Sequence, residues 1–213
     1  MCGGEYKVWN GMIRHMFEIN GEEIVARTIR LLRENGVDNI AISSNNMAFV
    51  KYGLPLLQHK NEYVSYGFNK HEGKGHWCDA FYPTDDPACY IFGDVVFSPE
   101  AIKTIIQTET DDIEFFASAP PFSPEYPKSW AEPFALKVVN QKHLREAIQR
   151  TKELAEQGEF AIDPIMWHLW RVIKGKGIEK KDINWTVIND YTCDVDKWSD
   201  AIYYKKILTE KEG

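Results

Sequence analysis

The chain has no long apolar run. No stretch of about 18 consecutive apolar residues occurs, which excludes a membrane-spanning helix on the sequence alone. It also has no basic and then apolar leader before a small-residue cleavage site, so no secretion signal is predicted. Positive charge is in deficit, with 25 Lys and Arg against 32 Asp and Glu and a net charge of −7. This disfavours a broad nucleic-acid surface, which needs a positive field, but it leaves room for a local basic pocket that binds phosphate.

Cysteines are few: Cys2, Cys78, Cys89 and Cys193 in 213 residues. No two stand at a zinc-site spacing, and a disulfide framework suits shorter secreted chains. We therefore expect four reduced thiols and a cytoplasmic protein. Repeats, low-complexity tracts and linkers are also missing, whereas aromatic residues are too many for a disordered chain. These features predict one compact domain over residues 1–213.

Helices and strands are expected to alternate. Asn20-Gly21 predicts a turn, residues 22–35 have the spacing of an amphipathic helix, and Asn35-Gly36 predicts its end. A buried strand is expected over 37–44 and a central strand over 88–97, followed by a helix capped by Ser98. Further strands are expected at 113–119, 134–139 and 185–188, a tight acidic turn at 191–196, and helices at 77–82, 101–108, 142–157, 160–174 and from 198. The order predicts an α/β fold with three layers (α/β/α) and a mixed, mostly parallel central sheet.

Asp94 is the first candidate for chemistry. It is a carboxylate in an otherwise apolar strand, which is costly unless it is paired, protonated or bound to a cation. The carboxyl end of a central strand is also where α/β sheets bind ligands. The simpler explanation is an Asp satisfied by the backbone amides of the next turn.

Asp194 and Asp196, with Asp190 nearby, are the second candidate. Carboxylates at i and i+2 of an extended segment point the same way and suit a hard divalent cation, normally Mg²⁺. The alternative is an acidic loop that caps the following helix.

Gly3 and Gly4 allow backbone amides to approach a phosphate, although a glycine pair is more often a plain turn. Arg14, Lys7 and Lys74 lie in or near loops that contain glycine, where each is either a phosphate clamp or ordinary surface charge.

Trp130 and Glu132 lie in the proline-rich loop predicted after Pro120, and Lys137 lies in the strand that follows it. A Trp face beside a carboxylate can hold a polyol or a quaternary amine, and packing of that loop is the simpler explanation.

Taken in order, these segments resemble the sugar-phosphate nucleotidyltransferase (pyrophosphorylase) superfamily. The resemblance rests on a Gly-rich opening, on Ile19-Asn20-Gly21 with its following helix, and on Gly36-Val37-Asp38-Asn39-Ile40. It continues with Phe92-Gly93-Asp94-Val95-Val96, similar to the family's Gly-Asp metal strand, and with Cys193-Asp194-Val195-Asp196 late in the chain. It covers most of the chain up to about residue 113 and returns near residue 190. Arg14 stands where the family has Lys, and Lys197 where it has Thr. The family's first strand has no counterpart, so the resemblance implies either that the natural chain begins upstream of Met1 or that this strand is absent.

The resemblance implies the nucleotide-diphospho-sugar transferase (GT-A-like) fold. It also implies a reaction in which a phosphorylated acceptor attacks the α-phosphorus of a nucleoside triphosphate and pyrophosphate leaves. By similarity, Arg14 and Asp94 would be catalytic, and Asp94, Asp194 and Asp196 would hold Mg²⁺. The nucleotide would be bound by Gly3, Gly4, Ser43, Asn45 and Gly75, and the acceptor by Trp130, Glu132 and Lys137.

The chain then divides into a nucleotide-binding part (1–113), an acceptor-binding part (114–190), and a metal segment with a closing helix (191–213). The partners are a nucleoside triphosphate, with CTP slightly favoured, and a sugar 1-phosphate, alditol phosphate or phosphocholine. A homodimer also fits. Two alternatives stay open: a glycosyltransferase of similar fold that uses Asp194-Val195-Asp196, and a non-catalytic nucleotide-binding homologue.

Overall fold

The structure is a computed structural model that describes residues 1–2, 8–9, 12–58, 77–119, 131–160, 164–175 and 184–212. Its main sheet has four strands in the order β11-β9-β10-β7. They are β7 (Ala88–Ile91), β9 (Ile113–Ser118), β10 (Pro133–Val138) and β11 (Thr186–Ile188). β10 runs antiparallel to β7 and β9, and β11 runs parallel to β9. β7, β9 and β11 therefore share one direction, and their carboxyl ends lie at one edge of a mixed sheet.

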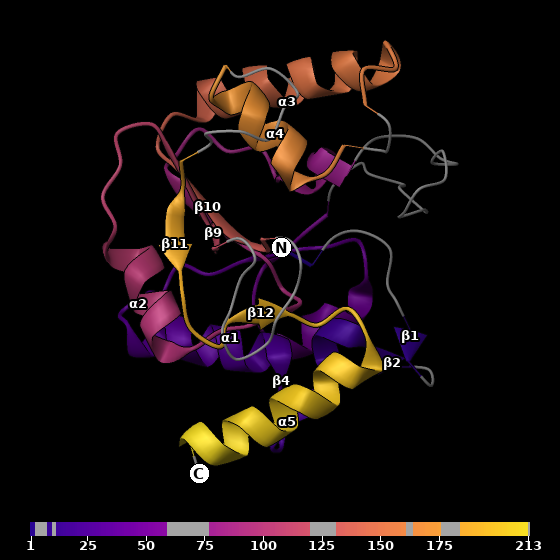
Figure 1. The fold of residues 1–213 in the computed structure, drawn as a ribbon, viewed down its shortest axis with the longest axis vertical. Coiled ribbons are helices and arrows are strands. Elements are labelled where there is room, and N and C mark those ends of the chain that lie inside the picture. The colour runs from indigo at the N-terminus through magenta and orange to yellow at the C-terminus, as the bar shows by residue number, and fades with distance from the viewer. Residues whose placement is uncertain are drawn as a thin grey trace.

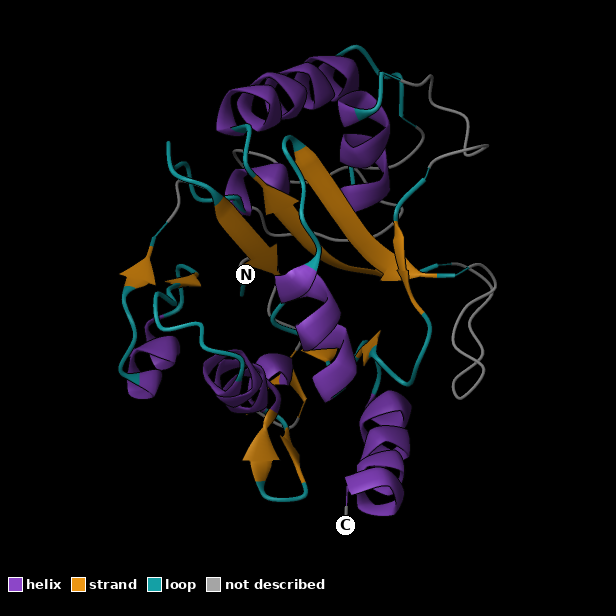
Figure 2. Cartoon of the chain, turned by 90° about the vertical axis from the view of Figure 1, so that its left-hand side faces the viewer, coloured by secondary structure: helices purple, strands orange, loops and turns teal. Residues whose placement is uncertain are grey.

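Helices cover the sheet on both sides (Figures 1 and 2). On one side lie α3 (Gln141–Glu156) and α4 (Met166–Ile173). On the other lie α1 (Ile24–Glu34) and α2 (Pro99–Gln107), with α5 (Trp198–Glu212) outside them. The predicted three-layer α/β/α class is confirmed. Ser98 caps α2 as predicted, because its Oγ accepts the Ala101 N–H at 2.9 Å.

Asn20 and Gly21 form the predicted turn, with φ of 53° and 82°. The turn joins β3 (Glu18–Ile19) to β4 (Glu22–Glu23), so α1 begins two residues later than the sequence pattern indicates. Positive φ at both central residues is the conformation of a tight hairpin, which Asn-Gly adopts readily.

The predicted strand at 37–44 is much shorter in the structure. Only β5 (Ile42–Ser43) forms, parallel to β6 (Leu56–Leu57). Residues 37–41 lack ladder partners among the described residues, and a strand without a partner is not stable as a strand. The first half of the chain also contains three short 3₁₀ helices, η1 (Arg14–Met16), η2 (Met47–Tyr52) and η3 (Trp77–Ala80). It further contains the short antiparallel pair of β1 (Val8–Trp9) and β2 (Met12–Ile13).

The predicted strand at 88–97 is divided in two. β7 ends at Ile91, the chain bends at Gly93 and Asp94, and β8 (Val95–Val96) leaves the main sheet. β8 pairs with β12 (Cys193–Asp194), antiparallel, so the predicted tight turn at 191–196 contains a strand. This pairing fastens the closing segment beside the carboxyl end of β7.

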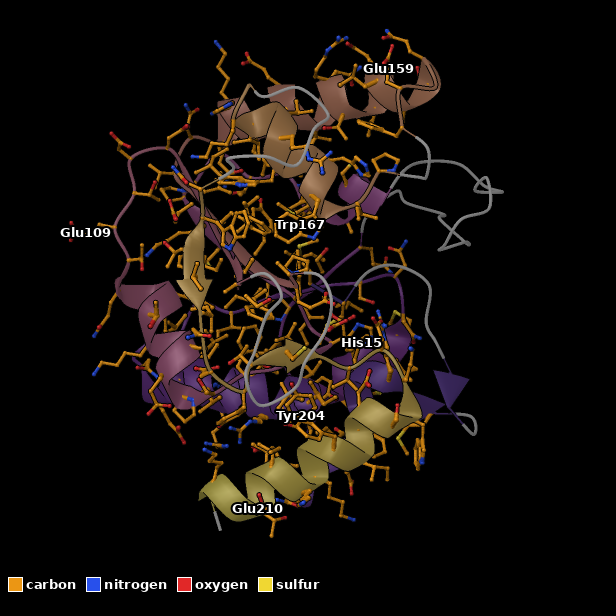
Figure 3. All side chains as sticks on the ribbon, in the orientation of Figure 1. His15, Glu109, Glu159, Trp167, Tyr204 and Glu210 are labelled. Carbon is orange, nitrogen blue, oxygen red and sulfur yellow. The ribbon has the colours of Figure 1, made fainter. Side chains whose placement is uncertain are left out.

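Three hydrophobic clusters support these elements. The largest lies around the main sheet and contains Phe115, Phe134 and Trp170, all fully buried. A second joins α5 to the β3–β4 hairpin and β8, and Figure 3 shows its Tyr204 on the side of α5 that turns toward the rest of the chain. A third lies between α1, β5 and η2. None of the described helices is both long and apolar enough to cross a membrane.

Candidate active site at the carboxyl edge of the sheet

The two acidic segments meet through their backbones. Asp194 lies opposite Val95 in the β8–β12 ladder, and the Val195 N–H donates to the carbonyl of Asp94 at 2.9 Å. Asp94 leaves β7 at its carboxyl end, the edge where ligands of α/β sheets bind. The structure therefore brings Asp94, Asp194 and Asp196 to one place, as predicted from the sequence.

Arg14 lies between these acids. It belongs to η1. Nη2 of Arg14 forms an ion pair with Oδ2 of Asp94, and Nη1 of Arg14 donates to Oδ1 of Asp196 at 2.8 Å. The Arg14 side chain is only 14% exposed, whereas that of Asp196 is 37% exposed. One guanidinium thus bridges the middle of the chain and its closing segment, and the Asp196 side opens toward water.

The charges of this cluster shift one another. Burial disfavours the charge of Arg14, but Asp94, Asp196 and Asp194 outweigh it and raise the pKa of Arg14 above its ordinary value. Burial would raise the pKa of Asp94, but the positive charge of Arg14 outweighs it and holds that pKa below its usual range. Asp94 is therefore a carboxylate at neutral pH and an oxygen donor for a cation.

His15 follows Arg14 and is 3% exposed (Figure 3). Burial lowers the pKa of His15 to about 4, so its imidazole is neutral at pH 7. A Cβ built on Gly93 would come within 3.2 Å of Cδ2 of His15 and 2.8 Å of the Met1 carbonyl, and would overlap Sγ of Cys2. Gly93 thus lets η1 and the N-terminal residues pack directly on the bend that carries Asp94.

Two carboxylates, one buried and one half-buried, hold the closing segment. Asp200, 2% exposed, accepts the backbone N–H groups of Asp196 and Lys197 at 3.0 and 2.9 Å. Asp190 accepts the Ser98 hydroxyl and the Thr192 N–H, the latter at 2.7 Å. Asp190 is therefore part of the support of β12, and Asp200 fixes the backbone at Asp196.

Ser43 and Asn45, predicted to border the nucleotide, end β5 at the same edge. The Ser43 hydroxyl donates to the Ala80 carbonyl at 2.9 Å, and its own carbonyl accepts the Cys2 N–H at 2.9 Å. Asn45 lies two residues after Ser43 and is exposed. The Ser43 hydroxyl thus has a structural partner, while Asn45 is accessible to a ligand.

Glu132 and Lys137 lie at opposite ends of β10. Glu132 is 7% exposed, and its N–H donates to Oγ of Ser118 at 2.8 Å, at the carboxyl end of β9. Lys137 lies opposite Cys89 at the start of β7, and its ammonium donates to the Ile106 and Thr108 carbonyls at 2.8 and 2.6 Å. Glu132 is thus at the edge that holds Asp94. Lys137 is at the opposite edge, where its ammonium caps the last turn of α2.

The predicted nucleotide-binding residues Gly3, Gly4 and Gly75, the basic residues Lys7 and Lys74, and the predicted acceptor-binding residue Trp130 lie outside the described residues.

Two residues that support the site were not singled out from the sequence. The signal for Asp200 was present, because an acid at the third position of a helix commonly accepts the N–H of the capping residue, here Lys197. His15 carried no such signal, since its burial depends on the approach of Gly93 and of Phe49, whose ring centroid is 5.8 Å away.

The fold of the chain has counterparts among solved structures. No family model matches the chain, and no curated protein matches it. The solved structures that match include one described as a glucose-1-phosphate thymidylyltransferase from Bacillus anthracis in complex with sucrose. It has 13% identity and a TM-score of 0.58, and the match covers 97% of this chain and 92% of that one.

Two others are an inositol-1-phosphate CTP transferase from T. maritima and a CTP:phosphocholine cytidylyltransferase from Streptococcus pneumoniae. Both have TM-scores of 0.51, with identities of 12% and 13%. The matches cover 96% and 93% of this chain and 91% of each of those chains. The chain thus has the α/β fold shared by these nucleotidyltransferases.

Proposed function

We propose that the chain is a nucleotidyltransferase that joins a nucleoside triphosphate to a phosphorylated sugar or small alcohol and releases pyrophosphate. The observation that carries the proposal is the convergence of Asp94, Asp196 and Arg14 at the carboxyl edge of the sheet. Two carboxylates and a guanidinium are the groups that binding a polyphosphate with a cation requires.

Asp94 and Asp196 fit a Mg²⁺ ion that takes only two of its ligands from the protein. Asp94 and Asp196 already share one positive group, so both carboxylates reach a common point. No cluster of three or more His, Cys, Asp or Glu side chains suited to a metal occurs in the part of the chain that the structure describes. Mg²⁺ commonly takes one or two carboxylates and completes its shell with water and substrate phosphates. Asp94 and Asp196 would hold it, with Asp194 beside them, and when bound it would neutralise charge on the phosphates.

Arg14 would act on the triphosphate. Its fork of N–H donors now binds two carboxylate oxygens, a geometry that matches two phosphate oxygens equally well. Since the pKa of Arg14 is raised, the group stays charged throughout. It would bind and orient the phosphates at the edge of the sheet, where positioning and charge neutralisation supply most of the rate enhancement of phosphoryl chemistry.

Glu132 would face the acceptor. It is a buried acid at the carboxyl end of β9, on the same edge as Asp94 but two strands away. A carboxylate there accepts hydrogen bonds from a hydroxyl or pairs with a cationic head group. The acceptors named for the three similar structures are phosphorylated compounds of both kinds, and we propose the same class for this chain, with CTP as the favoured donor.

A pyrophosphate-release screen tests the proposal. The four nucleoside triphosphates would each be combined with sugar 1-phosphates, alditol phosphates and phosphocholine, with Mg²⁺ present. One donor and acceptor pair should release pyrophosphate, and Asp94→Asn should lower kcat at least 100-fold, as loss of a group that stabilises charge in the transition state commonly does.

The matched control is Glu146→Gln, an exposed acid on α3, on the opposite side of the molecule from α5. It should retain full activity. Full activity of Asp94→Asn would refute the assignment of the site. Release of sugar from a nucleotide sugar without pyrophosphate would identify a glycosyltransferase instead. Binding of a nucleotide without turnover of any pair would identify a non-catalytic homologue.

A further inference from the structure

The guanidinium of Arg14 holds the two carboxylates that would bind the divalent cation. Its Nη2 pairs with Oδ2 of Asp94, and its Nη1 donates to Oδ1 of Asp196. A guanidinium and a divalent cation repel each other, and in contact with the same two carboxyl groups they compete for them. Cation binding at this place therefore requires that Arg14 give up these oxygens.

The charge of the cluster favours such an exchange. Asp94, Asp196 and Asp194 all act on the charge of Arg14. Three carboxylates exceed one guanidinium, so the cluster stays negative while Arg14 is its cation. A divalent cation carries twice the charge of Arg14 and compensates more of this negative charge.

The hydrogen bonding of Arg14 is incomplete in this position. Its Nε is buried and has no hydrogen-bond partner among the residues that the structure describes. Arg27 of α1 is a useful contrast, because its Nε and Nη2 both donate to the Phe97 carbonyl, at 3.2 and 3.1 Å. A buried N–H without a partner is unfavourable, so Arg14 is held less completely than an arginine with a purely structural role.

The carboxylates do not depend on Arg14 for their position. The Val195 N–H donates to the Asp94 carbonyl at 2.9 Å, and Asp200 accepts the Asp196 N–H at 3.0 Å. These bonds hold the backbone on both sides of the cluster when the side chain of Arg14 moves. Since the Asp196 side chain is 37% exposed, an ion can reach the cluster from water on that side.

We propose that Arg14 holds the place of the divalent cation until the cation binds, and that its side chain then leaves Asp94 and Asp196 and becomes available to phosphate. The identities of the cation and the phosphate compound rest on the proposed function. Cation binding and the release of a phosphate-binding group are then one event. Such coupling is reciprocal, so a polyphosphate that takes up Arg14 raises the affinity for the cation by the same factor.

The accessibility of Arg14 in the unmodified protein tests the exchange. Phenylglyoxal modifies accessible arginines, and mass spectrometry measures its rate at Arg14. Saturating Mg²⁺ should raise that rate about fivefold or more relative to NaCl of equal ionic strength, because it shifts the side chain to the exposed position. Inorganic triphosphate added with Mg²⁺ should lower it again. Arg30, which is already 42% exposed between Glu22 and Glu34, should react equally in all samples.

The affinity for Mn²⁺ is the second readout, measured by electron paramagnetic resonance of the free ion. Arg14→Met removes the competing charge and should lower the Kd of Mn²⁺ about tenfold or more. Arg30→Met is the matched control, because it removes the same charge from between two carboxylates on α1 and β4 and should leave the Kd unchanged. If Arg14→Met does not fold, the modification rates in the unmodified protein still decide.

An Arg14 rate that Mg²⁺ leaves unchanged or lowers would overturn the proposal, as would equal or weaker Mn²⁺ binding by a folded Arg14→Met protein. Both readouts are free of nucleotide and turnover, so they separate this inference from the proposed function. Exchange without pyrophosphate release from any pair would refute only the proposed function. Pyrophosphate release by a protein in which Arg14 does not respond to Mg²⁺ would refute only the exchange.

Discussion

Nη1 of Arg14 lies 2.8 Å from Oδ1 of Asp196, although 182 positions of sequence separate the two residues. The same guanidinium forms an ion pair with Asp94. Three segments, near the start, middle and end of the chain, are therefore fixed by a single side chain.

Replacement of Arg14 should show how much of its effect on kcat comes from its positive charge and how much from its two-pronged hydrogen bonding. Arg14→Lys keeps one positive charge but lacks the fork that reaches two oxygens, so we expect kcat to fall about 10-fold, and Arg14→Ala to lower it about 100-fold or more. Pyrophosphate release at saturating substrate measures both. Thermal melting of each variant shows whether the fold is kept, and an Arg14→Ala protein that is folded and fully active would contradict the role.

Asp200 should act through the position of Asp196. Asp200→Ala removes the acceptor of two backbone N–H groups, and we expect a loss of about 1 kcal/mol of unfolding free energy, as for other helix caps. The Mg²⁺ concentration for half-maximal activity should also rise, whereas a purely structural role would leave it unchanged. Asp200→Asn retains an acceptor oxygen and should restore most of both quantities.

The free energy of unfolding should depend on pH through His15. The unfolded imidazole titrates near 6.5 and the folded one near 4, so between these values the unfolded state binds more protons and stability rises with pH. The contribution is fully present above pH 6.5, and about 2 kcal/mol of it is lost between pH 7 and 5. Urea unfolding at both pH values measures this loss. His15→Gln should show a smaller loss by that amount, and an equal slope would show that His15 is not the group responsible.

Gly93→Ala should be strongly destabilising, because the added Cβ meets the Met1 carbonyl and Cys2. We expect a loss of about 2 to 3 kcal/mol by urea unfolding, within the range for overpacking. Gly53→Ala is the comparison, since a Cβ there meets nothing within 4 Å and only its φ of 67° is unfavourable. Cys2→Ala in the Gly93→Ala background should recover part of the loss, and strict additivity of the two changes would contradict the contact.

Lys137→Met should reduce stability and leave catalysis intact. It removes an ammonium that donates to the last carbonyls of α2, which we expect to cost about 1 to 2 kcal/mol. KM for both substrates should stay unchanged at a temperature where the variant is folded. A raised KM would return Lys137 to the acceptor site.

The sequence predicts local structure well where one interaction decides it. The Asn20-Gly21 turn, the Ser98 cap and the meeting of Asp94 with Asp194 and Asp196 were all predicted, and each depends on a residue type with few alternatives. The strand at 37–44 was overestimated, because a strand also needs a ladder partner, and residues 37–41 have none among the described residues.

Side-chain partners across the fold were harder to foresee. From the sequence, Lys137 is a basic residue in a strand, which is also what a phosphate-binding residue would be. Only the packing of α2 shows that the carbonyls of this helix surround its ammonium. His15 and Gly93 gave no pattern, because their contact joins segments far apart in the chain.

The separate hydrophobic cluster beneath α5 affects the order in which the protein unfolds and loses activity. Tyr204, Ile207 and Leu208 attach the closing helix to the β3–β4 hairpin and β8, not to the main sheet. Under mild denaturant this helix can therefore open as a cooperative unit of its own and carry Asp196 away. Inactivation would then precede the collapse of the sheet, and a fully inactive sample would still have most of its secondary structure.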